Sequence, residues 1–93
     1  MDSIIQNDRT RCYLCDSCRW LEEHHVFGGY ANRKHSEKYG LKVYLCHYCH
    51  NEPPDGVHYD KKKMDKLRET GQRYFEMYYP EEDFKKIFGV NYL

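Results

Sequence analysis

The sequence predicts a small α+β fold that is stabilised by zinc, with a core of two short antiparallel strands, an irregular loop and a helix, followed by C-terminal helices. Three observations favour it. The chain of 93 residues has room for one domain but not for a deep core. Four of its five cysteines form two Cys-x-x-Cys pairs, and short domains often rely on such a metal site. Near residue 60 the pattern changes from strand-like runs to helical periodicity.

The cysteine pairs are Cys12 with Cys15 and Cys46 with Cys49. A Cys-x-x-Cys turn presents two sulfurs to one metal ion, and two such turns complete a tetrahedral structural zinc site. Cys18 also forms a Cys-x-x-Cys motif with Cys15. We expect Cys12 to be the partner of Cys15, because the residues after Cys15 then form the turn that follows the knuckle, and Cys18 stays free. The alternative is five buried thiols without metal.

The chain divides into a lead-in and one domain. Residues 1–11 lack periodicity and predict a flexible lead-in or a short edge strand. Residues 12–93 form the domain. Its first part, residues 12–60, holds every cysteine and histidine and is rich in turn residues, whereas residues 60–93 have a helical pattern.

The first part of the domain predicts strand, crossing, strand and helix. We expect a strand over residues 19–24 that runs into a loop at Gly28-Gly29. Residues 31–39 contain helix formers that stop at Gly40, an acceptable helix end. Residues 41–45 are rich in β-forming side chains and predict the second strand.

The last part predicts a long helix and a short one. Asp60 can cap the long helix, and Pro80 ends it. Its apolar positions recur at spacings of three and four: Met64, Leu67, Gly71, Tyr74, Phe75 and Tyr78. The short helix has an apolar face of Phe84, Ile87 and Phe88, followed by Gly89. Ten tyrosines in a chain poor in Leu and Ile must supply burial, so we expect this aromatic stripe in the core rather than stacked on bases.

Composition narrows the function classes. The mean hydropathy is −1.03 and no apolar run approaches membrane-spanning length, which predicts no membrane contact. The chain opens without a secretory leader, so we expect a reducing cytoplasmic location and metal ligation rather than disulfides. Net charge is zero, which counts against a strongly basic nucleic-acid binder. Residues 30–50 nevertheless carry a balance of +3, either a phosphate-binding patch or an ordinary solvated face.

The histidines predict a second metal site. His24 and His25 are adjacent, so on a strand their side chains face opposite ways. One can bind a metal while the other faces a substrate. His50 directly follows the second cysteine pair, and His58 precedes the long helix.

These residues carry a resemblance to a known family. The segments HHVFGG, YGLKVYLCHYCHN and GVH resemble the HNH endonucleases, a ββα-metal family, and most of all its small zinc-knuckle members in phage and prophage genomes. The resemblance covers residues 12–60, and the tail IFGVNYL is also similar to phage proteins of this kind. It implies that His24 is a metal ligand, that His25 is the general base, and that His50 and His58 complete the metal site.

The chain departs from the family pattern at two places. The family's loop Asn would fall near Leu41, where this chain has none, so either Asn32 or Ser36 replaces it or the restraint is lost. The two distal histidines are usually closer in sequence than His50 and His58. Either His58 binds from a longer loop, or His50 acts without it, or Asn51 enters instead.

The expected function is therefore that of a metal-dependent HNH endonuclease that hydrolyses DNA phosphodiester bonds. A neutral imidazole can activate water near pH 7. One divalent cation, Mg²⁺, Mn²⁺, Ni²⁺ or Zn²⁺, suits the scissile phosphate and the leaving oxygen. Arg33, in the basic segment, can contact a phosphate oxygen bidentately. The expected partners are DNA and either a second copy of the chain or a phage protein complex.

Two other functions are compatible with the sequence. The first is a non-catalytic zinc module that binds DNA or a protein, which keeps the four-cysteine site and treats the histidines as incidental. The missing loop Asn, the histidine spacing and the neutral charge favour it. The second is a protein–protein adaptor built on the aromatic C-terminal helices. The histidine doublet at a predicted strand end favours the enzyme.

Overall fold

A two-stranded antiparallel sheet lies at the centre of the computed structural model, which describes residues 2–93. Strand β1 spans Leu21–His25 and strand β2 spans Lys42–Cys46. In the register of the sheet, Leu21 faces Cys46 and His25 faces Lys42. The sheet was expected over residues 19–24 and 41–45, so both strands are confirmed with a shift of one or two residues. The small α+β class is confirmed with them.

The connection between the strands is a helix rather than an irregular loop, and here the expected core is wrong. Helix α1 spans Tyr30–Tyr39, and only the short turn around Gly28-Gly29 is irregular. The helix formers in this stretch decide the outcome together with Gly40, which ends α1 in the left-handed conformation at φ 72°. After β2 the chain forms one short helix, α2, at His47–Asn51.

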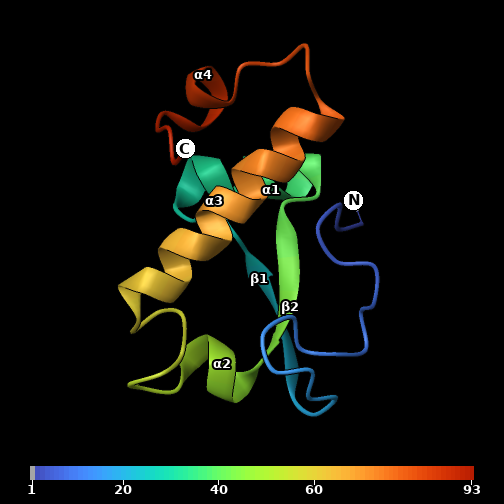
Figure 1. Cartoon of the computed structure of the whole chain (residues 1–93), viewed down its shortest axis with the longest axis vertical. Helices are drawn as coiled ribbons and strands as arrows, with labels where there is room; N and C mark the ends of the chain where they lie inside the picture. Colours follow the sequence, from blue (N-terminus) through green and yellow to red (C-terminus); the bar gives the residue numbers. More distant parts are fainter. Residues whose placement is uncertain (1) are drawn as a thin grey trace.

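The C-terminal part contains the two expected helices. Helix α3 spans Lys61–Tyr78 and begins at Asp60, whose carboxylate accepts the N–H groups of Lys62 and Lys63. Helix α4 spans Phe84–Phe88. Figure 1 shows α3 crossing the sheet diagonally, with α4 near its C-terminal end and α2 near its N-terminal end.

Phenylalanine and aliphatic side chains make the core. The expectation that the tyrosines supply the burial is wrong, because Tyr39 is the only buried tyrosine in residues 2–93. Phe27, just after β1, contacts Phe84 and Phe88 of α4 with ring centroids 5.1 and 4.8 Å apart. Phe75 of α3 lies on the same group, 5.3 Å from Phe84. Gly71 lets α3 approach, because a Cβ there would lie 3.0 Å from the Phe27 ring. Tyr78 is an exception to the predicted stripe, since it is exposed.

The N-terminal segment lies along β2 without forming a strand in residues 2–11. The Ile4 N–H donates to the Gly40 carbonyl at 2.9 Å. The Gln6 side chain accepts the Tyr44 N–H at 2.7 Å. These bonds bring the first cysteine turn to the end of the sheet where β2 delivers Cys46.

Candidate metal centres and active site

The two cysteine pairs meet at the end of the sheet. Cys12 and Cys15 lie on the turn after the N-terminal segment, whereas Cys46 ends β2 and Cys49 lies in α2. The sulfur atoms of these four cysteines all lie within 4.8 Å of one another. The sulfurs of Cys15 and Cys46 are 3.6 Å apart. Four thiolates on a tetrahedral zinc, with bonds of ~2.3 Å, are separated by about 3.8 Å, so these four cysteines fit a zinc ion.

The local backbone prepares both turns for a metal. In each pair the second cysteine donates its N–H to the first sulfur, at 3.5 Å in both turns. Such bonds favour the thiolate form. Burial and the neighbouring thiols, in contrast, raise the pKa of Cys49. Four thiols therefore ionise together only when a cation compensates their charge. Cys18 lies outside the group and is exposed, as expected.

Three histidines form a second group, to which α2 also contributes a residue. His24 extends from β1, His50 from α2, and His58 from the loop before α3. Their ring nitrogens lie within 4.8 Å of one another, and Nε2 of His50 is 3.0 Å from Nε2 of His58. Two imidazoles on a tetrahedral zinc, with bonds of ~2.05 Å, place these atoms about 3.3 Å apart. The donor set and spacing fit a divalent cation.

His24 has the burial and the free ring nitrogen expected of a metal ligand. Its side chain is buried, and its Nε2 has no hydrogen-bond partner among residues 2–93. Burial, together with His50 and His58, lowers the pKa of His24 to about 3. The ring is therefore neutral at physiological pH and offers a lone pair. A buried nitrogen without a partner is costly in a folded protein, and a metal bond would remove that cost.

Glu22 orients the second histidine. It lies on β1, on the same face as His24, and its carboxylate accepts Nδ1 of His50 at 2.7 Å. Nδ1 thus carries the proton, which leaves Nε2 free to bind. The same carboxylate accepts the amide of Asn51 at 3.0 Å and Nδ1 of His47 at 3.0 Å. The hydrogen bonds to His47 and His50 lower the pKa of Glu22, so its carboxylate stays ionised.

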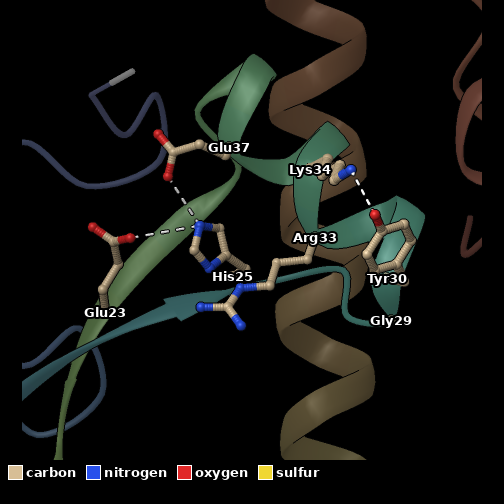
Figure 2. A pocket seen from close by; sticks show the side chains of 7 residues that line it. All are labelled: Glu23, His25, Gly29, Tyr30, Arg33, Lys34 and Glu37. Atoms are coloured by element: carbon tan, nitrogen blue, oxygen red, sulfur yellow. Dashed lines mark hydrogen bonds and ion pairs between the residues drawn. The ribbon is translucent and has the colours of Figure 1, made fainter.

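His25 faces away from this group, as strand geometry predicts. Its Nε2 is 3.0 Å from Glu37 of α1 and 3.5 Å from Glu23, and Figure 2 shows both carboxylates on one side of the ring. Lys42, directly opposite on β2, lies 3.1 Å from Glu37 and 3.3 Å from Glu23. The bonds from His25 and Lys42 lower the pKa of Glu37 to about 2. Glu23, His25 and Glu37 are close enough together to bind a metal. Because the Lys42 ammonium already balances the charge of the two carboxylates, we interpret Glu23 and Glu37 as residues that orient His25.

One pocket is lined by both His24 and His25, although their side chains point to opposite faces of β1. It has a volume of about 310 Å³ and is lined by Glu23, His24, His25, Gly28, Gly29, Arg33, His50 and His58. A neighbouring hollow continues past His25 to Tyr30, Lys34 and Glu37. Figure 2 shows the Arg33 guanidinium on the side of the His25 ring away from the carboxylates. The structure thus brings every predicted catalytic and metal-binding residue of the histidine site to one pocket.

The candidates for the family's loop Asn lie elsewhere. The amide of Asn32 donates to the Phe88 carbonyl at 3.1 Å, and the buried Ser36 hydroxyl bonds both backbone groups of Phe27. Neither lines the histidine pocket. Of the alternatives for the last ligand, His58 has a ring nitrogen within 4.8 Å of those of His24 and His50, whereas the Asn51 side chain donates to Glu22.

Sequence reasoning missed Glu22, Glu37 and Lys42. Glu22 stands two residues before His24, and this period-two spacing was a usable signal, since it puts both on one face of a strand. Glu37 and Lys42 had no such signal, because only the helical crossing brings α1 beside His25.

Comparisons with known proteins give no family for this chain. No protein-family model matches it, and neither a curated protein nor a solved structure shows a significant match. Within residues 2–93, no helix combines the length and apolar character needed to cross a membrane. The functional argument therefore depends on the side chains of the pocket.

Proposed function

We propose that this protein is a metal-dependent endonuclease of the HNH type, which hydrolyses DNA phosphodiester bonds with His25 as general base. The observation that carries the proposal is the shared pocket, in which three converging imidazoles lie beside a carboxylate-held histidine and an arginine. The four-cysteine group then serves as the structural zinc site.

The arrangement of His25 supports its role as the base. In the neutral ring, Nε2–H donates to Glu37, so Nδ1 keeps its lone pair. Nδ1 has no protein partner among the described residues, and Figure 2 shows it turned toward the Arg33 side. Nδ1 can accept a proton from the attacking water, and the carboxylates of Glu37 and Glu23 stabilise the imidazolium that results.

The other residues of the pocket have separate tasks. His24, His50 and His58 would hold one divalent cation, which polarises the scissile phosphate and stabilises the leaving oxygen. Glu22 fixes the orientation of His50. Arg33 supplies a permanent positive charge and a planar pair of donors for a phosphate oxygen. The water oxygen attacks phosphorus, its proton goes to His25, and the bond from phosphorus to the leaving sugar oxygen breaks.

One observation favours the non-catalytic zinc module instead. The contact between His50 and His58 is itself a satisfactory hydrogen bond at 3.0 Å. Three histidines that pack against each other, with ring centroids 4.8 to 5.3 Å apart, can stabilise the loop before α3 without any metal. Under this alternative, His24 and His58 matter for stability and not for cleavage.

The test is the metal dependence of cleavage. Zinc-loaded protein is incubated with supercoiled plasmid and increasing Mg²⁺, Mn²⁺ or Ni²⁺, and nicked and linear products are quantified. We expect cleavage only with added metal, abolished in His58→Ala and retained in His35→Gln, a histidine on α1 that contacts Phe88 outside the pocket. Cleavage that persists in excess chelator rules out the metal mechanism. DNA binding without cleavage under any metal supports the zinc module.

A further inference from the structure

We infer that Arg68 and the cavity beside it form a subsite for a flanking nucleotide of the DNA strand, next to the histidine pocket and separate from it. The inference depends on the proposed function, because it states where the strand continues beyond the phosphate at the metal. Arg68 has no part in that function as proposed, and Arg33, which does, does not line this cavity.

His58 lies between two cavities. One is the histidine pocket, and the other has a volume of about 570 Å³ and is lined by His58, Arg68, Lys61 and two tyrosines among others. No other residue lines both cavities. A strand whose scissile phosphate lies at the histidines can therefore place its next nucleotide in the second cavity by passing this one side chain.

Arg68 has unused hydrogen-bond donors at this cavity. A guanidinium carries five N–H groups, and those of Arg68 have no hydrogen-bond or ion-pair partner in residues 2–93. Its Nε is buried, and a buried donor without an acceptor is costly in a folded protein. Because an N–H group only donates, the missing partner is an acceptor and not a metal. A phosphate offers two oxygens in the geometry that a guanidinium binds.

The fold holds Arg68 in place without using these donors. One turn later on α3, the Gln72 side chain accepts the Tyr92 N–H at 2.7 Å and so fixes the C-terminal segment against the helix. The Tyr92 ring centroid lies 5.7 Å from Cζ of Arg68, and the same ring packs 5.4 Å from Phe27 of the core. An aromatic face attracts a cation but accepts no strong hydrogen bond. The guanidinium is thus oriented while its N–H groups stay available.

The other residues of the cavity suit a nucleotide. Asp65 is the one carboxylate in its lining, and it is paired with Lys61 at 2.7 Å rather than with Arg68. The charge of Arg68 is therefore not neutralised. Tyr59 is 59% exposed, so its ring can stack on a base. A phosphate donor beside an exposed aromatic ring fits a nucleotide better than a free inorganic anion.

The experiment measures DNA binding without cleavage. Zinc-loaded protein is titrated into a short fluorescein-labelled duplex without added divalent cation, and anisotropy is followed over a range of KCl concentrations. Arg68→Gln should weaken binding about tenfold at low salt, because charge-assisted hydrogen bonds are lost. It should also reduce the slope of log affinity against log salt by about 0.9, the value of one phosphate contact. Lys66→Gln removes the same charge from α3 outside this cavity and should leave the slope unchanged.

A measurement on the unaltered protein keeps the test independent of how Arg68→Gln folds. The Nε–H signal of Arg68, assigned by its absence in Arg68→Lys, is followed by ¹⁵N NMR as unlabelled duplex or inorganic phosphate is added. We expect the duplex to shift it. A shift with inorganic phosphate alone, no shift with either, or equal loss of slope in Arg68→Gln and Lys66→Gln overturns the subsite.

The two proposals fail in different ways. A silent Arg68 signal in a protein that cuts DNA with added metal overturns the subsite and leaves the proposed nuclease standing. Conversely, binding of the duplex at Arg68 without cleavage under any metal contradicts the nuclease. The subsite then belongs to a zinc module that binds DNA.

Discussion

The cysteine group and the histidine group share helix α2, through Cys49 and His50, but they are built differently. The cysteines come as two local pairs, and their four sulfurs can occupy every position of a tetrahedral ion. The histidines come from a strand, a helix and a loop, and they provide three donors beside a pocket of about 310 Å³. A complete ligand set serves structure, whereas a set with an open position leaves room for substrate. Under the proposed function, the cysteine group would stabilise the fold and the histidine group would carry the chemistry.

The largest expected effect comes from breaking the cysteine group. Cys46→Ser removes a ligand whose sulfur also accepts the Cys49 N–H. We expect stoichiometric zinc to be lost and cooperative thermal unfolding to disappear, because binding energy at such a site is folding energy. Metal analysis and circular dichroism measure both. Cys18→Ser should leave both unchanged, and wild-type protein without tightly bound zinc would contradict the assignment.

The second effect distinguishes the two adjacent histidines within the open site. His25→Ala should reduce DNA cleavage by ~10²–10⁴ while leaving metal affinity near normal, because it removes the general base. His24→Ala should weaken the metal itself, so that cleavage partly returns at high metal concentration. A metal titration of cleavage for both variants measures this difference.

Neither histidine change should release the cysteine zinc. Equal rescue of both variants by excess metal would show that His25 is not the base. Full activity in both would mean that the doublet is structural.

The smallest effect concerns Glu22, which holds the proposed ligand His50 without being a ligand itself. Glu22→Gln should weaken metal binding at the histidines by about 10–100-fold, because the carboxylate that orients His50 is lost. Calorimetric titration of zinc-loaded protein with Mn²⁺ or Ni²⁺ measures it. Glu52→Gln is the matched control, since Glu52 contacts His47 at 3.1 Å and does not touch His50. If the metal affinity of Glu22→Gln is unchanged, Glu22 does not orient His50 for metal binding, and its role is limited to the exposed contact with His47.

The sequence predicted the elements better than their connection. Asp60, Gly40 and Gly89 act as helix ends where local rules place them, because capping depends on a few neighbouring residues. The crossing between the strands was expected as an irregular loop. It is instead a helix, because its helix formers and the terminal Gly40 favour α1. The turn at Gly28-Gly29 takes up only a few residues before the helix begins.

The candidate site was predictable where the chemistry is local and not where it depends on packing. Cys-x-x-Cys spacing and strand alternation placed the four cysteines and separated His24 from His25. The sequence predicted His58 as a ligand but kept Asn51 as an alternative, because the choice depends on how the loop before α3 folds back. Glu37 and Lys42 come beside His25 only through the α1 crossing and the strand register.

Cys49 and His50 are consecutive residues of helix α2, so the two candidate metal sites are linked through one helical turn. An ion bound by either residue would order the same turn, so we expect occupancy of one site to raise affinity at the other, and linkage makes the factor the same in both directions. A newly synthesised chain without zinc would then be inert toward DNA. Under the proposed function, the zinc supply of the cell would set how many molecules become competent to cut, without any dedicated inhibitor.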